Sequence, residues 1–319
     1  KVAMVTNNDL VREQIELLVQ ARRAKGNEFI DILKMGRTEM QDAVPMTLGQ
    51  EFHSMAAALE DEVTFIRASE KPLFSINMGG TAIGTGLNAP AGYAEKTAAH
   101  LAKLTGKPYY KAPDLIAGTW DQHAFVAESG AMRSLAVKLS KIASDMILLS
   151  SGPRAGLGEI NLPPVQPGSS IMPGKVNPVM PELVNLVSFR VIGNDLTVTL
   201  AARNGQLQLN AYEPVVAIAV LESQRLLANT MATFRTRCVD GITVNADTLE
   251  GYIERTVGIV TALNPVIGYD RATELAKEAY STNKGILEIV REKKILSEEQ
   301  IEDILSPGAL TGLDKKQYE

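Results

Sequence analysis

Apolar residues recur at intervals of three and four along most of this chain. The longest such run covers almost three heptads, through Met132, Leu135, Leu139, Ile142, Met146 and Leu149. Side chains at this spacing lie on one face of an α-helix, so the segment predicts a long helix with a buried seam. No segment shows the competing alternation that is typical of a half-buried strand.

The same spacing predicts about four further long helices. One covers the amphipathic stretch from Leu10 to Leu33, and another has Phe52, Met55, Leu59, Val63 and Ile66 on one face. The other two contain Leu183, Val184, Val187, Val191 and Ile192, and then Val215, Ile218, Leu227, Met231 and Phe234. We therefore predict an all-α protein built on long packed helices.

Dense loops separate these helices, at residues 35–50, 77–92 and 150–178. After Cys238 the pattern changes to shorter, charged helices, the first of them capped by Asn245-Ala246-Asp247. We place a domain boundary near residue 245. Residues 1–245 form the predicted central helical bundle, and residues 246–319 form a small C-terminal helical domain.

Composition narrows the function classes. The chain has 319 residues, is 45% hydrophobic and carries a formal net charge of −5, with no basic cluster that would favour nucleic acid. Cys238 is the only cysteine, which fits a reducing compartment. No apolar run approaches the ~20 residues of a membrane span. We expect a cytoplasmic protein that binds neither nucleic acid nor membrane.

Residues 168–178, Gly-Ser-Ser-Ile-Met-Pro-Gly-Lys-Val-Asn-Pro, combine groups suited to catalysis. Gly168 and Gly174 give the backbone freedom, while the two prolines restrict it. A potential base, Ser169 or Ser170, stands near a cation, Lys175. A surface turn is the plain alternative, but a turn needs no adjacent serines placed before a lysine and an asparagine.

Other candidate chemistry is weaker. Gly84-Thr85-Gly86 suggests a phosphate loop, but no Gly-Lys-Ser/Thr follows it. His53, His100 and His123 lack the spacing of a metal site, so we predict none. Arg37 is expected to form structural ion pairs.

Residues 168–178 closely resemble the signature of the aspartase/fumarase superfamily. Residues 36–50 (Gly-Arg-Thr to Leu-Gly-Gln) and 79–88 (Gly-Gly-Thr-Ala-Ile-Gly-Thr-Gly-Leu-Asn) are similar to two further conserved segments. The aspartase branch is favoured by residues 159–163, 179–185 and 205–214. Fumarases typically differ after Asn177-Pro178 and carry histidine where this chain has Glu39.

The resemblance implies a fold and an assembly. The superfamily has a bundle of five long helices flanked by two smaller domains, and it forms homotetramers through a twenty-helix core, with active sites shared between subunits. Lys1 aligns inside the first long helix, just past a Ser-Ser/Thr-Asn-Asp motif. We therefore expect that the family's N-terminal domain and this motif are absent from the present sequence.

The resemblance also implies a carbon–nitrogen lyase that reversibly eliminates ammonia from L-aspartate to give fumarate. No organic cofactor is required, while activation by a divalent cation is left open. Two alternatives stay open as well: fumarate hydratase, and an inactive oligomeric scaffold that lacks part of the site.

Residue roles carry over onto the matching positions. Ser169 is the general base that takes the proton next to the β-carboxylate, and the charge then spreads into that carboxylate as an aci-carboxylate. The pKa of its hydroxyl has to be lowered, which nearby loop amides and Lys175 can do. Lys175, Asn177 and Ser170 bind a substrate carboxylate. Met172 packs against the carbon chain of the substrate, and Thr38 forms a hydrogen bond to it. Gly168 and Gly174 are the hinges of a closing loop.

Glu39 suggests a separate hypothesis. In the family, the residue that matches Glu182 approaches this position from another subunit. Two carboxylates so close do not both ionise easily, so one would hold a proton near neutral pH. A protonated Glu39 would then donate a hydrogen bond to the substrate, whereas a solvated glutamate lining the cleft is an equally good interpretation.

Overall fold

The computed structural model describes residues 1–166, 168, 172 and 174–312. The described chain forms two compact units. The first unit comprises residues 1–19, 57–147 and 165–238, and the second comprises residues 20–56, 148–164 and 239–319.

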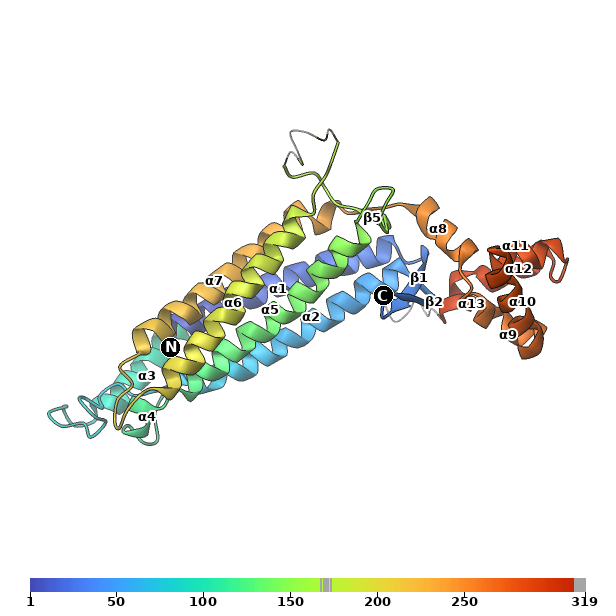
Figure 1. Cartoon of the computed structure of the whole chain (residues 1–319). Coiled ribbons are helices and arrows are strands. Elements are labelled where there is room, and N and C mark those ends of the chain that lie inside the picture. The colour runs from blue at the N-terminus through green and yellow to red at the C-terminus, as the bar shows by residue number, and fades with distance from the viewer. Residues whose placement is uncertain (167, 169–171, 173, 313–319) are drawn as a thin grey trace. The chain divides into compact units, whose positions relative to one another are not determined.

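Helices dominate the described residues, and five of them are long (Figure 1). The long helices are α1 (Val2–Glu28), α2 (Leu48–Glu70), α5 (His123–Leu149), α6 (Val179–Arg203) and α7 (Glu213–Arg237). The shorter helices are α3 (Tyr93–Thr105), α4 (Ala117–Trp120), α8 (Ala246–Arg255), α9 (Val260–Ile267), α10 (Tyr269–Thr282), α11 (Ile286–Glu292), α12 (Glu298–Leu305) and α13 (Pro307–Thr311), with 3₁₀ turns at Lys71–Phe74 and Val239–Gly241. The strands form three two-stranded sheets: β1 (Leu33–Thr38) with β2 (Gln41–Thr47), β3 (Ser75–Ile76) with β4 (Tyr110–Lys111), and β5 (Ile160–Asn161) with β6 (Thr243–Val244).

The first unit is a bundle to which all five long helices contribute. Polar side chains join neighbouring helices inside it, for example α2 to α5 through Ser134 and Glu62 at 2.9 Å, and α6 to α7 through Asn194 and Ser223 at 3.1 Å. Between these contacts lie the apolar seams. All six residues of the 132–149 run are buried, which confirms that helix and its inward face. The predicted long-helix bundle is therefore confirmed.

A buried carboxyl group lies inside this bundle. Glu128 has no solvent exposure, and its oxygens accept hydrogen bonds from Gln224 Nε2 at 3.0 Å and Ser69 Oγ at 3.1 Å. Burial away from water raises the pKa of Glu128 above its ordinary value of 4.5. The hydrogen bonds from Asn8, Gln224 and Ser69 oppose that rise, and the nearby Glu70 carboxylate adds to it.

We expect Glu128→Gln to stabilise the protein at alkaline pH. Since the folded-state pKa of Glu128 lies above the unfolded value, folding binds a proton between the two, and stability falls as pH rises through that window. The slope from one such group reaches about 1.4 kcal/mol per pH unit. Urea unfolding of both proteins from pH 4.5 to 9 would measure this. The free energy of unfolding of the variant should increase relative to that of the wild type as pH rises. A constant difference across that range would contradict this account.

The second unit contains the one long hairpin among the described residues. We predicted a loop over residues 35–50, and this was wrong, since β1 and β2 pair antiparallel from Leu33 with Thr47 to Thr38 with Gln41. The predicted helix from Leu10 to Leu33 was also too long at its C-terminal end, because α1 ends at Glu28. Short-range periodicity did not detect the hairpin because Gly36 and Pro45 interrupt its alternation.

The C-terminal helices of the second unit share an apolar core. Met35 of β1 is buried in it together with Ile253, Ile259, Leu263, Leu275, Ile286 and Val290. The helix expected after Asn245 is α8, but Asn245 does not cap it through its side chain. The side-chain amide of Asn245, through Nδ2, instead donates to the Gly158 carbonyl oxygen at 2.7 Å. The domain boundary near residue 245 stays a prediction.

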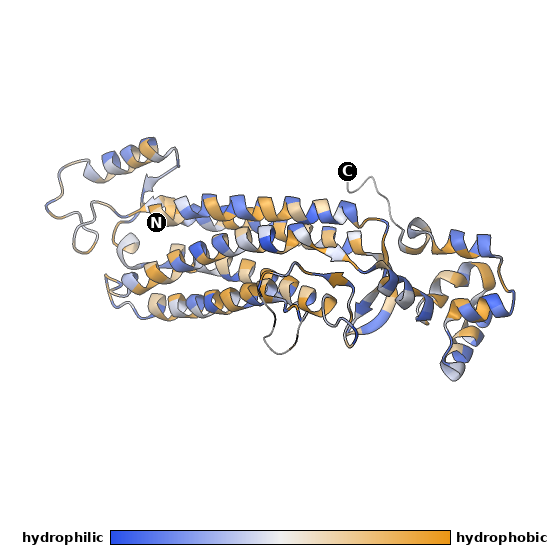
Figure 2. Cartoon of the chain, turned by 90° about the horizontal axis from the view of Figure 1, so that it is seen from above, coloured by the Kyte–Doolittle hydropathy of each residue, from blue (hydrophilic) through white to orange (hydrophobic). Residues whose placement is uncertain are grey.

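Helix α6 has an apolar surface that this chain leaves exposed. Leu186, Phe189, Leu196 and Leu200 are each at least half exposed. By length and composition alone α6 is the one described helix apolar enough to cross a membrane, although core helices of other proteins pass the same test. Figure 2 shows hydrophobic and hydrophilic residues interleaved along the long helices. Interleaving of this kind is typical of amphipathic helices, which bury one face and expose the other.

Candidate active site

The tip of the β1–β2 hairpin presents two of the predicted site residues. Thr38 ends β1 opposite Gln41, so Glu39 and Met40 form a two-residue turn. Both turn residues have left-handed backbone angles, with φ of 52° and 64°. A non-glycine residue rarely adopts this conformation, and two in succession mark the strained turn as a candidate functional position. The side chains of Thr38 and Glu39 are exposed there.

A bulge shapes the strand that leads to this tip. The pairing register shifts between Met35 and Arg37, at Gly36. A Cβ atom at residue 36 would lie 2.8 Å from the Val44 carbonyl oxygen, so only glycine fits without displacing the backbone. The glycine of the Gly-Arg-Thr motif therefore sets the geometry of the hairpin.

Four charged side chains meet at the base of the hairpin. Glu159 is fully buried and forms ion pairs with Arg37 and with Lys34 Nζ, the latter at 2.8 Å. Lys34 also contacts Glu51 Oε2 at 2.7 Å. The ion-pairing role expected of Arg37 is thereby confirmed. Glu159 was not predicted as a functional residue. Its partner Arg37 lies 122 residues away in the sequence, so no short-range pattern could have pointed to Glu159.

The signature loop is fixed at its base. Asn177 Nδ2 donates to the Gly168 carbonyl oxygen at 3.0 Å. A Cβ atom at residue 168 would lie 1.5 Å from the Lys175 carbonyl oxygen, so the two arms of the loop approach each other at a point where only glycine fits. Gly174 has a φ of 79°, in the left-handed region that glycine adopts without strain. Lys175 and Met172 are exposed.

Two of the predicted residues, Ser169 and Ser170, lie outside the described residues. Glu182 stands in the first turn of α6, where it is exposed. Thr38 and Glu39 belong to the second unit, whereas Met172, Lys175, Asn177 and Glu182 belong to the first. The described structure brings Gly168 and Asn177 together, and it brings Thr38 and Glu39 together at one turn.

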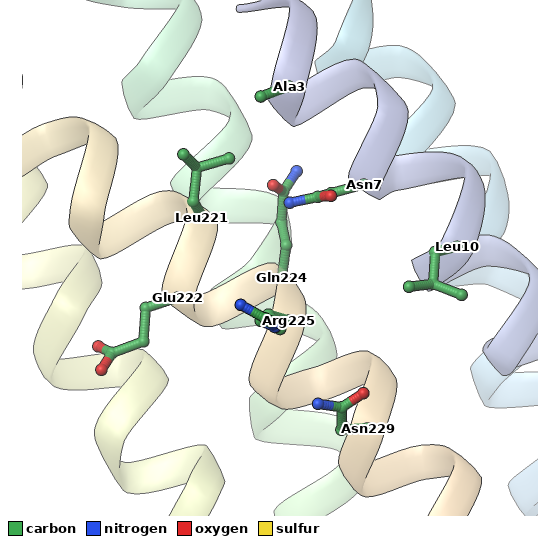
Figure 3. Close-up of a pocket in the computed structure, with 8 residues that line it drawn as sticks. All are labelled: Ala3, Asn7, Leu10, Leu221, Glu222, Gln224, Arg225 and Asn229. Atoms are coloured by element: carbon green, nitrogen blue, oxygen red, sulfur yellow. The ribbon is translucent and has the colours of Figure 1, made fainter.

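The described cavities lie away from these residues. One, of about 720 Å³, opens between α1 and α7 and is lined by amide, charged and apolar side chains (Figure 3). Another, of about 550 Å³, is lined by residues that include Lys71, Tyr110 and Asp121. None of the predicted site residues lines either cavity. Among the described residues no group of three or more His, Cys, Asp or Glu side chains could hold a metal ion.

The chain is similar to known lyases along most of its length. A family model described as Lyase matches residues 1–193, and one described as Fumarase C C-terminus matches residues 259–312. Aspartate ammonia-lyases from Pseudomonas aeruginosa and Escherichia coli strain K12 are 52% and 49% identical to this chain, each over 96% of it. The chain spans 65% and 64% of the length of these two relatives.

Solved structures show the same fold. A fumarate lyase:delta crystallin from Brucella melitensis bound to cobalt has a TM-score of 0.91 and 48% identity, over 95% of this chain and 66% of that one. A class II fumarase from Schistosoma mansoni has a TM-score of 0.87 and 33% identity, over 96% of this chain and 68% of that one.

The helical bundle and the family model that matches residues 1–193 place the chain among helical-bundle proteins of a lyase family. The chain belongs to the aspartase/fumarase superfamily.

Proposed function

We propose that this protein is an aspartate ammonia-lyase, which reversibly converts L-aspartate into fumarate and ammonia. The identity of about 50% to curated aspartate ammonia-lyases over 96% of the chain is the observation that carries this proposal. The 33% identity to the Schistosoma fumarase makes fumarate hydratase the second candidate. No organic cofactor takes part in the proposed reaction.

The proposed mechanism gives every predicted residue a role. Ser169 removes the proton from the carbon next to the β-carboxylate. Lys175 with Ser170 binds that carboxylate in the substrate and stabilises the aci-carboxylate that it becomes. Asn177 either binds that carboxylate or holds the loop, and its contact with Gly168 supports the second role. The other assignments are Thr38 as a substrate hydrogen-bonding residue, Met172 against the carbon chain, and Gly168 and Gly174 as hinges.

Glu39 and Glu182 form the proposed carboxylate pair, contributed by different subunits. A protonated Glu39 donates a hydrogen bond to the substrate, and the strained turn holds it at the hairpin tip. Glu39→Gln should then keep most of kcat/KM while flattening its pH profile, and Glu39→Ala should lose about tenfold. Unchanged kinetics in both variants would refute this role.

We also propose a homotetramer formed through the bundle helices. The exposed apolar side chains of α6 support it, because an apolar helix face of this kind is buried between subunits in stable oligomers. Sedimentation equilibrium would test it, and a monomer at micromolar concentration would rule it out.

Activation by a divalent cation is a separate proposal, prompted by the cobalt-bound Brucella structure. Enzyme treated with EDTA should regain activity on addition of Mg²⁺ or Co²⁺. Equal activity with and without the cation would refute it.

The assay that decides the function follows fumarate by its absorbance. The full-length protein, incubated with L-aspartate, should produce fumarate and equimolar ammonia. Production of fumarate from L-malate alone would favour the hydratase. Absence of activity on both substrates would favour a scaffold without catalysis.

A further inference from the structure

The four-charge cluster at the base of the hairpin is unusual because it is largely closed to solvent. Glu159 and Lys34 are 0% and 2% exposed, while Arg37 and Glu51 reach the edge of the cluster. Removing such charges from water is costly, and apolar side chains of similar volume often stabilise a fold as well or better. Stability alone therefore does not account for the cluster.

The backbone of Glu159 is held from two directions. Its N–H donates to the Leu149 carbonyl oxygen, at the end of α5, at 2.8 Å. Its own carbonyl oxygen accepts from the Asn245 N–H at 2.9 Å. Because both hydrogen bonds fix the Cα position, the carboxylate projects from a rigid point toward β1.

The guanidinium of Arg37 is oriented by a second contact. It lies over the ring of Tyr252, 5.4 Å from the ring centroid, a favourable cation–π distance. The Tyr252 hydroxyl donates to the Leu157 carbonyl oxygen at 2.8 Å, two residues before Glu159. Residues 157–159 thus hold Arg37 in two ways. Glu159 forms the ion pair with it, and the Leu157 carbonyl oxygen anchors the Tyr252 ring on which the guanidinium lies.

Both partners of this ion pair lie close in the sequence to predicted site residues. Arg37 precedes Thr38 and Glu39 at the hairpin tip. Glu159 lies in the segment 157–164, which precedes the signature loop in the sequence and whose Pro163 and Pro164 restrict the backbone. Pro163 packs against Gly241, where a Cβ atom would lie 2.6 Å from the proline ring.

We propose that Glu159 is a positioning residue for the lyase reaction. Through Arg37 and Lys34 it holds the hairpin that carries Thr38 and Glu39 in a fixed position on the segment 157–164. The inference rests on the proposed function for its kinetic test, whereas the fixation of the hairpin can be tested without it.

The experiment compares Glu159→Gln with a matched control in the full-length protein. Glu70→Gln removes another buried carboxylate, 5% exposed and paired with Arg12, from the bundle. We expect Glu159→Gln to lower kcat/KM for L-aspartate about 100-fold, mainly through kcat, because a displacement of about 1 Å in a catalytic group costs that much. Glu70→Gln should stay within about twofold of wild type at a temperature where both are folded.

Hydrogen exchange provides the readout that is independent of activity. Amides of residues 33–47 should exchange faster in Glu159→Gln and at the wild-type rate in Glu70→Gln. A wild-type protein without activity on L-aspartate would refute the proposed function, and hydrogen exchange alone would then decide the inference.

Three results would each overturn the proposal. The first is wild-type kcat in Glu159→Gln, and the second is an equal loss of kcat in Glu70→Gln. The third is unchanged hydrogen exchange in the hairpin of Glu159→Gln. If Glu159→Gln does not fold, Lys34→Met/Glu159→Gln takes its place, since it leaves Arg37 and Glu51 as balanced charges and has the same expected outcomes.

Discussion

Replacing Ser169 with alanine should reduce kcat for L-aspartate deamination by about three orders of magnitude. General base catalysis is worth about 10²–10⁴-fold, and none of the described residues of the loop (168, 172 and 174–178) carries a hydroxyl or carboxylate that could replace the serine. The substrate carboxylate ligands remain in this variant, so KM should change little. Steady-state kinetics on the full-length protein would give both constants.

Ser170→Ala is the matched control for this prediction, because it removes the same atom one residue away. Its kcat should fall less, as expected of a hydrogen-bond donor to the carboxylate. Exchange of the C3 proton of L-aspartate with deuterated solvent separates the two serines further, since it requires the base. Exchange at the wild-type rate in Ser169→Ala would assign the base elsewhere.

The bundle could be predicted from the sequence because its signal is local. An apolar seam such as that of α5 needs only the spacing of neighbouring residues, and burial of the whole 132–149 run follows from it. The hairpin could not be predicted in this way. Its bulge at Gly36 breaks the two-residue period, and its turn residues, Glu39 and Met40, are not those that favour left-handed angles.

The candidate site also contains residues that the sequence could predict and residues that it could not. Lys175 and Asn177 stand in one contiguous motif, so a short stretch of sequence is enough to nominate them. Glu159 depends on a pairing with Arg37 across 122 positions, and its fully buried carboxylate is visible only once the chain is folded. Sequence reasoning also gave Asn177 a single role toward substrate, whereas its hydrogen bond to Gly168 adds a structural one.

Lys175→Met should raise KM for L-aspartate about 10- to 100-fold and lower kcat/KM by at least as much. Hydrogen bonds to charged groups contribute about 1.5–3 kcal/mol, and methionine keeps the length of the side chain while removing the charge. Because Lys175 is exposed, its loss should leave the melting temperature unchanged within about 2 °C.

Lys103→Met, on an exposed position of α3, controls for the general loss of one positive charge. Its kinetic constants should equal those of the wild type. If the two lysine variants behave alike, Lys175 does not bind the substrate carboxylate. A loss of kcat at unchanged KM in Lys175→Met would have a different meaning. The ammonium would then stabilise only the charge that develops in the aci-carboxylate, and it would not bind the ground-state substrate.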